Sequence, residues 1–512
     1  MVNEVKTATV IGINAYEVSV ETDVVNSLPA MSIVGLPDTS INEAKDRVKS
    51  AIKNSGYTFP NKKVVVNLAP ADLKKEGTSF DLPIAVGILT EEEVVIPEQT
   101  KGYAFIGELS LDGTIRAVAG VLPLVYGLKE AGIENVIVPK ANVKEAALNV
   151  GINVYGAEHL TDVVNHFTQN KIDKTVIDVK SYLSDHSLSD YEYDFKDVKG
   201  QHKAKKALEI AAAGAHNMLM VGSPGSGKTL MAKCFPSILP PLELSEALEL
   251  TKIYSICGLL PSDKPLMVNR PFRTIHHSAS ANGIIGGGTN PKPGEITLAN
   301  RGVLFLDEMV EFPRQVLEVL RQPLEDGQIV ISRAKHSVTY PAKFVLLGAM
   351  NPCPCGFLGD KEKQCTCSEY QINRYLSKLS GPLLDRIDIQ VDVLRLTPSE
   401  LLAIDSKEED SATIRKRVIR AREIQLERYK DEGILTNSEL TSKLIKKYCK
   451  LDEETQKILK VAVVKYQLSG RRYDRMLKLA RTIADLEGSE NIKQSHIMQA
   501  LQFKMSASLI NG

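Results

Sequence analysis

The sequence predicts an α/β protein of several domains that ends in a helical region. Three observations lead to this prediction. Short β-rich runs alternate with helical stretches over residues 1–395, a glycine-rich string follows an apolar strand at residue 222, and residues 396–512 show an almost wholly helical pattern. Strands that alternate with helices are typical of a parallel sheet covered on both faces. At 512 residues the chain is also longer than one hydrophobic core usually supports.

These patterns divide the chain into four parts. Residues 1–168 are expected to form a compact α/β domain, residues 169–195 a polar and acidic linker, residues 196–395 a second α/β core, and residues 396–512 a helical lid. In the first domain the runs ATVIGI, KVVVNLAP, YAFIGELS and NVIVPK predict strands, whereas Ser40–Ser55 and Val121–Ala131 predict helices.

The second core has its own succession of elements. A helix over Gln201–Ala215 leads into a strand over Met218–Val221, and the apolar runs VLFLDE (303–308) and FVLLGAMN (344–351) predict two further strands. In the lid, the long charged stretch Thr413–Tyr429 has the pattern of an amphipathic helix.

The composition narrows the classes of function. Sixty-three basic residues balance 63 acidic ones, so the whole molecule has no field that attracts nucleic acid, and any DNA contact must come from a local basic surface. No run approaches 18 apolar residues, and the start MVNEVKTATVIG has neither the basic region nor the apolar core of a signal peptide. We therefore expect a cytoplasmic protein without a membrane partner.

The string GSPGSGKT has the spacing of a phosphate-binding loop. Its glycines let backbone N–H groups close around phosphate oxygens, and the helix that follows favours an anion at its N-terminus. The ammonium of Lys228 is placed to reach the β- and γ-phosphates, and the hydroxyl of Thr229 to ligate Mg²⁺. The residues expected to bind the nucleotide are Gly222, Ser223, Pro224, Gly225, Ser226, Gly227, Lys228 and Thr229.

The run VLFLDE is an apolar strand that ends in two carboxylates. Asp307 is expected to hold the Mg²⁺, and Glu308 to polarise the attacking water. Alone, the glycine string could be a surface turn and the acidic pair a strand end that meets solvent. The two motifs in this order predict ATP hydrolysis with ATP and Mg²⁺ as cofactors.

Three more polar residues have places that suit this chemistry. Asn351 ends the third strand, where an amide can orient the attacking water. Arg386 precedes the apolar run IQVDV and is expected to reach the γ-phosphate of a neighbouring subunit. Arg471, at the start of a lid helix, is expected to sense the nucleotide, although Arg472 and Arg475 compete for that role.

Two insertions interrupt the core. The segment Asp326–Phe344 predicts a β-hairpin with Arg333, Lys335 and His336 at its bend. A charged tip is most often only solvated, but in a ring such tips would line a central channel and contact DNA phosphates. The segment 269–294 contains His276 and His277, for which a structural or interface role is favoured over metal binding.

Four of the seven cysteines lie close together, as CPCG and CTC. Two C-x-C pairs can fold onto one tetrahedral Zn²⁺, although C-x-x-C is the commoner spacing. Metal-free thiols in a loop are the alternative. The expected zinc ligands are Cys353, Cys355, Cys365 and Cys367.

Long motifs in the sequence resemble the ComM/YifB family of magnesium-chelatase-like AAA+ ATPases. They are RPFRTIHHSAS, PGEITLANRGVLFLDEM, NPCPCG with CTC, YLSKLSGPLLDRIDIQVDV and LSGRRYDRMLKLARTIADLE. The resemblance covers essentially the whole chain. It implies a P-loop AAA+ core that works as a homo-hexameric ring, with Asn351 as sensor 1, Arg386 as the arginine finger in trans and Arg471 as sensor 2.

The N-terminal domain resembles the proteolytic domain of Lon, a Lon-protease-like (S5-like) α/β fold. KKEGTSFDLPIAVGIL resembles the segment with the protease serine, which would be Ser79. The family lysine is expected near AGVLPL, where this chain has Leu122, Pro123 and Leu124. Lys129, farther along the helix, is a poor substitute. Because a serine without a base is an ordinary hydroxyl, the resemblance implies an inactive protease fold.

The resemblance also implies a function. Members of the family associated with natural transformation are viewed as DNA helicases that drive branch migration. We therefore expect an ATP-dependent motor on single-stranded or branched DNA, acting in recombination or natural transformation. The alternative is an ATPase that remodels proteins or inserts metal, as the chelatases do, and an ATP-dependent protease is disfavoured by the missing lysine.

Overall fold

The computed structural model of the chain describes residues 3–169, 171–184, 191–261, 263–288, 292–332, 337–360, 362–397, 400, 408–465 and 468–503. The chain divides into two compact units. Unit 1 comprises residues 1–185 together with 244–268, and unit 2 comprises residues 186–243 together with 269–512. None of the helices in these ranges is long and apolar enough to cross a lipid bilayer.

Unit 1 is a mixed sheet of eight strands with helices on both faces, in the order β10-β9-β8-β5-β1-β2-β4-β3. The strands of unit 1 are β1 (Asn3–Ile11), β2 (Asn14–Val25), β3 (Ala30–Val34), β4 (Lys63–Ala69), β5 (Tyr103–Phe105), β8 (Asn135–Pro139), β9 (Asn153–Ala157), β10 (Lys174–Thr175) and the small pair β6 (Glu108–Leu109) and β7 (Ile115–Arg116). Its helices are α1 (Thr39–Asn54), α2 (Asp81–Glu91), α3 (Pro97–Thr100), α4 (Val121–Glu130), η1 (Lys140–Asn142), α5 (Val143–Ala146), α6 (Leu160–Thr168), α7 (Val179–Ser184) and α10 (Leu244–Ile256).

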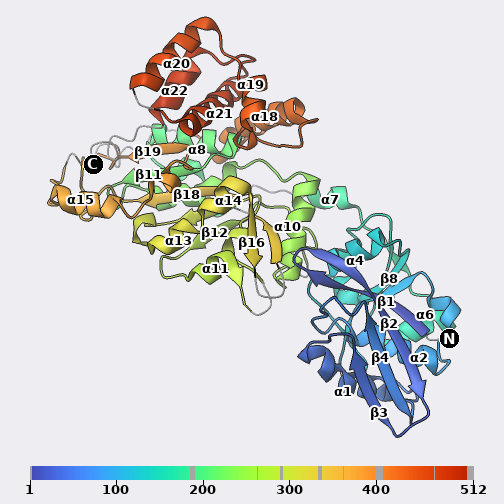
Figure 1. The fold of residues 1–512 in the computed structure, drawn as a ribbon. Helices are drawn as coiled ribbons and strands as arrows, with labels where there is room; N and C mark the ends of the chain where they lie inside the picture. Colours follow the sequence, from blue (N-terminus) through green and yellow to red (C-terminus); the bar gives the residue numbers. More distant parts are fainter. Residues whose placement is uncertain are drawn as a thin grey trace. The chain divides into compact units, whose positions relative to one another are not determined.

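The alternation of side chains along β1 gives the sheet two hydrophobic cores. Val5 points to the face that packs against α1 and α2, whereas Ala8, three positions on, points to the opposite face and packs against α4. Figure 1 shows β1, β2, β4 and β3 side by side. The segment expected as a linker also takes part, because β10 pairs antiparallel with β9.

Helix α10 belongs to unit 1, although the sequence boundary of residues 196–395 includes it in the second core. It packs against α4. The backbone N–H of Gly120 donates to the carbonyl of Ser255 at 3.0 Å, and the Ser255 hydroxyl donates to the buried carboxylate of Glu145 at 2.5 Å. The Lys252 ammonium lies 3.4 Å from the ring centre of Tyr126. Local patterns in the sequence do not show which distant helix α10 packs against.

Unit 2 consists of a five-stranded parallel sheet, two small hairpins and a C-terminal group of helices. Its strands are β11 (Met218–Gly222), β12 (Phe272–Ile275), β13 (Gly286–Gly287), β14 (Lys292–Pro293), β15 (Val303–Leu306), β16 (Gln328–Ser332), β17 (Ser337–Pro341), β18 (Val345–Met350) and β19 (Ile389–Val393). Its helices are η3 (Phe195–Asp197), α8 (His202–Gly214), α9 (Lys228–Cys234), η4 (Phe235–Ile238), α11 (Ala281–Ile285), α12 (Glu295–Leu298), η5 (Met309–Glu311), α13 (Arg314–Glu318), α14 (Arg321–Asp326), α15 (Glu369–Leu376), α16 (Gly381–Leu384), α18 (Ser411–Tyr429), η6 (Asn437–Glu439), α19 (Ser442–Tyr448), α20 (Glu453–Lys465), α21 (Gly470–Leu486) and α22 (Gln494–Gln502).

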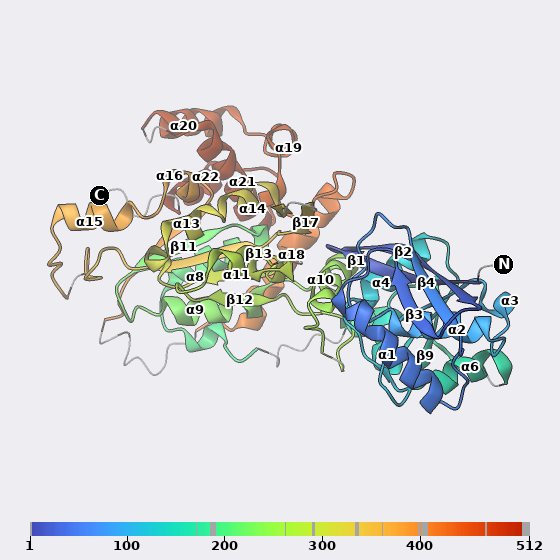
Figure 2. The ribbon, with the colours of Figure 1, turned by 60° about the horizontal axis from the view of Figure 1, so that its bottom comes forward.

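The sheet of unit 2 has the order β12-β15-β18-β11-β19 with every pair parallel. Strands β15 and β18 are buried along their whole length, which explains their uninterrupted apolar runs. Helices α8 and α9 lie next to β11 (Figure 2). The expected parallel sheet and the helical C-terminal region are therefore confirmed.

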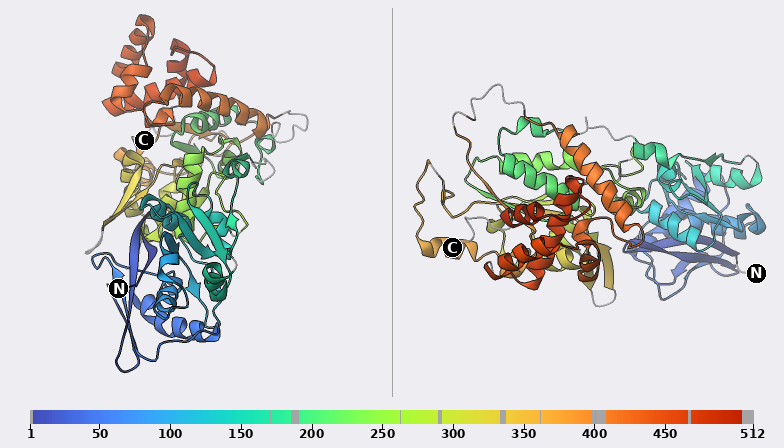
Figure 3. Two further views of the ribbon diagram at one scale, coloured as in Figure 1. Left: turned by 90° about the vertical axis from the view of Figure 1, so that its right-hand side faces the viewer. Right: turned by 90° about the horizontal axis from the view of Figure 1, so that it is seen from above.

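The C-terminal helices share one hydrophobic core with the sheet of unit 2. The long helix α18, orange in Figure 3, lies beside the green α8. A buried carboxylate ties this region together: Asp485 of α21 accepts hydrogen bonds from Arg428 at 2.5 and 2.9 Å, from Asn437 at 2.8 Å and from Arg481 at 3.1 Å.

Replacing Asp485 with alanine is expected to lower the free energy of unfolding of unit 2 by about 3–5 kcal/mol, because two largely buried guanidinium groups lose their acceptor. Urea unfolding followed by circular dichroism measures this change. Asp431→Ala, at an exposed position, serves as the control and should change stability by no more than about 0.5 kcal/mol. Equal unfolding midpoints for the two variants would contradict the prediction.

Candidate active site

The parallel sheet of unit 2 brings the sequence motifs to one edge. Strand β11 runs into the loop Gly222–Thr229, β15 into Asp307 and Glu308, and β18 into Asn351. Because parallel strands have their carboxyl ends at the same edge, these groups converge where α/β sheets usually bind ligands. Gly222 is required by close packing, since a Cβ there would lie 2.1 Å from the carbonyl oxygen of Val393.

Hydrogen bonds join the predicted nucleotide and Mg²⁺ ligands to one another. The Lys228 ammonium donates to the carbonyls of Gly222 at 2.7 Å and Ser223 at 2.9 Å, and it lies 3.4 Å from Oδ1 of Asn351. The Thr229 hydroxyl donates to Oδ2 of Asp307 at 2.8 Å. A hydroxyl and a carboxylate held together beside a phosphate loop are the oxygen ligands that Mg²⁺ prefers.

Glu308 adopts a strained backbone conformation with φ of 50°, in the left-handed region that side chains other than glycine rarely occupy. Its side chain is exposed and lies 3.8 Å from Nδ1 of His277. His277 follows β12, whose end meets the same edge of the sheet. The structure thus places one of the two adjacent histidines beside the carboxylate expected to polarise water.

Burial lowers the pKa of Lys228 from 10.5 to about 8, against the opposing effect of Asp307 and Glu308. Below this pKa the amine is protonated and attracts phosphate, and above it the charge is lost. The affinity for ADP is therefore expected to fall as the pH rises from about 8 to about 9.5, with proton uptake on binding. Calorimetric titrations across this range measure both effects. Lys228→Arg, which keeps its charge, should show a flatter profile, and an equally steep one would contradict the assignment.

A second group of charged residues contains the two predicted arginines. Arg386 is 7% exposed, forms an ion pair with Glu325 of α14, and donates to the carbonyl of Pro382 at 2.7 Å. Arg471, in the first turn of α21, donates to the other oxygen of Glu325 at 3.1 Å. One carboxylate thus holds both guanidinium groups, which lie far apart in the sequence.

Other arginines surround this pair. Burial and the neighbouring charges of Arg321, Arg471 and Arg475 lower the pKa of Arg386. Within the part of the chain that the structure describes, the buried Nε atoms of Arg321 and Arg386 have no hydrogen-bond partner. Arg472 instead donates to Asp385 at 2.8 Å, and Arg475 lies 3.3 Å from Asp388. Arg471 is therefore the lid arginine that shares a carboxylate with Arg386.

Two hairpins lie next to each other in unit 2. Strands β16 and β17 pair from Gln328↔Pro341 to Ser332↔Ser337, and the short β13 pairs with β14. A Cβ on Gly286 would lie 3.1 Å from Ile331, so the two hairpins touch. The predicted DNA contacts Arg333, Lys335 and His336 lie between β16 and β17 in the sequence, outside the described residues.

The four clustered cysteines converge in the loop between β18 and α15. The Sγ–Sγ distances are 3.4 Å from Cys353 to Cys355, 3.7 Å from Cys353 to Cys365, and 3.6 Å from Cys355 to Cys365. All four Sγ atoms, that of Cys367 included, lie within 4.8 Å of one another. A tetrahedral ion with Zn–S bonds of about 2.3 Å separates its sulfur atoms by about 3.8 Å, so the cluster fits zinc.

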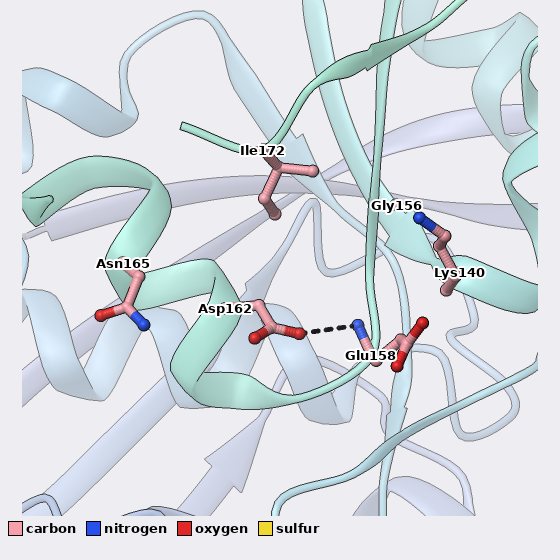
Figure 4. Close-up of a pocket in the computed structure, with 6 residues that line it drawn as sticks. All are labelled: Lys140, Gly156, Glu158, Asp162, Asn165 and Ile172. Carbon is pink, nitrogen blue, oxygen red and sulfur yellow. Dashed lines mark hydrogen bonds between the residues drawn. The ribbon is translucent and has the colours of Figure 1, made fainter. Parts of the chain in front are cut away.

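Unit 1 has a cavity of about 310 Å³, distant in sequence from these motifs. Figure 4 shows its lining residues and the backbone N–H of Glu158, which donates to Asp162 at 3.1 Å. The cavity is lined by Lys140, Gly156, Glu158, Asp162, Asn165 and Ile172.

Helix α4 of unit 1 carries the segment in which the Lon resemblance expects a lysine. Leu122 and Leu124 occupy it and are buried, at 1% and 2% exposure. The backbone carbonyl of Ser79 accepts a hydrogen bond from Gly107.

Sequence patterns alone miss three contacts of these sites. Glu325, which accepts from Arg471, lies between motifs in the segment LRQPLEDG. Asp360 belongs to no recognisable motif, although it accepts a hydrogen bond from Ser223 of the phosphate loop. His277 lies beside Glu308 only because the sheet brings the ends of their strands together. The sequence indicates these contacts only through the negative charge of Glu325 and Asp360, which can pair with a predicted basic residue or with a donor of the phosphate loop.

The phosphate loop, the strand order and the helical C-terminal region define this protein as a AAA+-type P-loop protein. Residues 194–401 match the family described as magnesium chelatase, subunit ChlI, residues 408–504 match its C-terminal family, and residues 20–142 match a further family described as subunit ChlI of Mg-chelatase.

Similar proteins extend over nearly the whole chain. The competence protein ComM of Haemophilus influenzae is 43% identical over 502 residues, covering 98% of this chain and 96% of the relative. The protein YifB of Salmonella typhimurium is 42% identical over 500 residues, with the same coverage. A magnesium-chelatase subunit ChlI homolog of Methanocaldococcus jannaschii is 26% identical over 257 residues, 46% of this chain and 69% of the relative. The chain belongs to the ComM/YifB family, with magnesium-chelatase-like ATPase domains, a membership that implies ATP and Mg²⁺ as cofactors.

Proposed function

We propose that this protein is an ATP-driven motor on single-stranded or branched DNA, working as a homo-hexamer that drives branch migration in recombination or natural transformation. The observation that carries the proposal is the convergence of Lys228, Thr229, Asp307 and Asn351 at one sheet edge, in the same unit as two adjacent hairpins. The relative described as a competence protein supports the biological setting.

In this proposal the chain's own residues divide the hydrolysis between them. Lys228 neutralises the β- and γ-phosphates, Thr229 and Asp307 hold Mg²⁺, and Asn351 orients the attacking water that Glu308 polarises. Mg²⁺ supplies charge neutralisation at the phosphates. Arg386, together with Arg471, stabilises the charge on a phosphate held by the neighbouring subunit.

The arginine cluster supports a shared interface. Buried guanidinium N–H groups that have no acceptor among the described residues favour an anion. Glu325 balances two of the charges within a single chain. A neighbouring γ-phosphate would compete with Glu325 for the same donors, so that closure of the interface and nucleotide binding become linked.

The DNA contact is proposed at the tip of the β16–β17 hairpin, through Arg333, Lys335 and His336. In unit 2 the hairpin buries Ile329, Ile331, Val338 and Tyr340 on one face, whereas Gln328, Val330, Ser332, Ser337 and Thr339 on the other face are exposed. A two-stranded arm that is anchored along one face is able to transmit a movement of the core to its tip.

ATP turnover measured with and without a synthetic Holliday junction tests the proposal, with junction dissolution followed in parallel. Wild-type protein should show junction-stimulated turnover and strand exchange, and Glu308→Gln should show neither. Replacing both Arg333 and Lys335 with alanine should abolish the stimulation. The control replaces Lys457 and Lys460, exposed on α20, with alanine and should keep it. Turnover indifferent to every DNA would instead favour a protein-remodelling or chelatase-like ATPase.

We also propose that Cys353, Cys355, Cys365 and Cys367 hold a structural Zn²⁺. The sulfur spacing supports it. So does the backbone N–H of Cys355, which donates to the Cys367 sulfur at 3.4 Å, because such bonds stabilise thiolates in metal sites. Bound zinc would cross-link the two cysteine pairs of the loop.

A further inference from the structure

We propose that the zinc loop is part of the nucleotide site: by fixing Asp360, bound zinc holds the phosphate loop in the conformation that binds ATP. The zinc loop is defined as the described residues 351–360 and 362–367, between β18 and α15. This inference rests on the proposed binding of ATP and zinc, and it assigns a positioning role to Asp360 and Ser223.

The first step of the argument is the contact between the two loops. The Ser223 hydroxyl donates to Oδ2 of Asp360 at 2.8 Å. Ser223 is the second residue of the phosphate loop and is only 6% exposed. The bond is partly buried, and a hydrogen bond to a carboxylate is among the stronger polar contacts in proteins, so it restrains the backbone of the phosphate loop.

The second step is the route from Asp360 to the cation that binds phosphate. The carbonyl of Ser223, the residue held by Asp360, accepts a hydrogen bond from the Lys228 ammonium at 2.9 Å. Asn351, at the start of the zinc loop, lies 3.4 Å from the same ammonium. The zinc loop therefore meets Lys228 directly through Asn351 and indirectly through Ser223.

The third step is the close packing of the loops. Gly356 has φ of +84°, and a Cβ there would lie 2.6 Å from Cδ of Pro224, the third residue of the phosphate loop. Gly356 directly follows Cys355. The proposed zinc ligand Cys355 is thus the neighbour of a residue that packs closely against the phosphate loop. A displacement of Cys355 would therefore also displace Pro224.

The fourth step is the position of Asp360 between the two cysteine pairs. Its other oxygen, Oδ1, accepts from the backbone N–H groups of Glu362 at 2.9 Å and Lys363 at 3.1 Å. Asp360 and both of these donors lie between Cys355 and Cys365 in the sequence. When one metal ion joins the two pairs, the span that carries Asp360 becomes a closed loop with few conformations, which lowers the entropic cost of keeping the Ser223 contact.

The test measures zinc content and nucleotide affinity in the full-length protein, without DNA. Zinc is counted by mass spectrometry of the metal, and the Kd for a fluorescent ADP analogue is measured with Mg²⁺ present throughout. A zinc-selective chelator should remove one zinc per chain and weaken ADP binding about tenfold or more, and added zinc should restore it. Unchanged affinity after zinc has left would overturn the inference.

Variants separate this role from a general loss of folding. Asp360→Ala and Ser223→Ala should each retain one zinc per chain yet bind ADP about tenfold more weakly, and the double variant should be no weaker than either. Glu362→Ala, an exposed carboxylate in the same loop, is the matched control and should bind like wild type. Zinc-loaded Asp360→Ala with wild-type affinity would refute the proposal. Because these measurements use no DNA, their results do not depend on whether the protein acts as a motor on DNA.

Discussion

Glu308→Gln is expected to reduce ATP turnover by about 10²- to 10⁴-fold and to leave nucleotide affinity within about twofold of wild type. The reason is that the amide keeps the size of the side chain but cannot take a proton from the attacking water. Glu308 also occupies a backbone conformation with positive φ, which a substitution of equal size leaves in place. Steady-state turnover and ADP titration measure the two quantities.

A neighbouring carboxylate provides the control for Glu308. Glu311 of η5 is 46% exposed and pairs with Lys378 at 3.4 Å. Glu311→Gln should keep turnover within about twofold. If Glu308→Gln and Glu311→Gln hydrolysed ATP equally well, the water-polarising group would have to be another residue, with His277 the first to examine because it lies beside Glu308.

Arg386→Ala is expected to lower ATP turnover by about 10³-fold or more while ADP binding to each subunit remains. In the proposed mechanism, the guanidinium group of one subunit stabilises the charge that develops on the phosphate held by the next. Arg374→Ala, at an exposed position on α15, is the matched control and should retain turnover. Circular dichroism verifies that loss of the partly buried ion pair with Glu325 has not unfolded the variant.

Mixed assemblies show whether Arg386 acts in trans. Subunits with Arg386→Ala keep an intact phosphate loop, whereas subunits with Lys228→Ala keep an intact arginine. When the two are mixed, some interfaces contain both a working loop and a working arginine, and turnover should rise above that of either variant alone. Turnover that stays at the level of the separate variants would assign Arg386 to its own subunit's nucleotide.

The elements of both units could be predicted from the sequence where a regular pattern is local. The predicted helix Val121–Ala131 is observed as Val121–Glu130, and the strand Met218–Val221 as Met218–Gly222. The predicted hairpin has the strands Gln328–Ser332 and Ser337–Pro341. In a strand every second side chain points to the same face, and in a helix every third or fourth does. Burial of one face therefore leaves a pattern in the sequence that can be recognised without knowledge of the rest of the fold.

The candidate site could be predicted only as far as its motifs are contiguous. Lys228 and Thr229 are recognisable because one loop needs both at fixed spacing. The partnership of Glu325 with Arg386 and Arg471 joins α14 to the residues after α16 and to the start of α21, and no spacing rule encodes it. The same holds for the contact of Asp360 with Ser223, since a lone aspartate in a polar loop is usually solvated.

Helix α10 has a consequence for how this protein can be taken apart. The chain enters unit 2, makes the phosphate loop and its helix, returns to unit 1 as residues 244–268, and only then completes the sheet. A truncation that starts at residue 191 would keep α10 and delete α4, leaving Ala247, Leu250 and Ile253 without the fold in which they are buried. A protease cut before residue 191 would likewise yield two fragments that each hold part of unit 1. Each unit is built from two separate segments of the chain, so neither unit can be removed or exchanged by a single cut in the polypeptide.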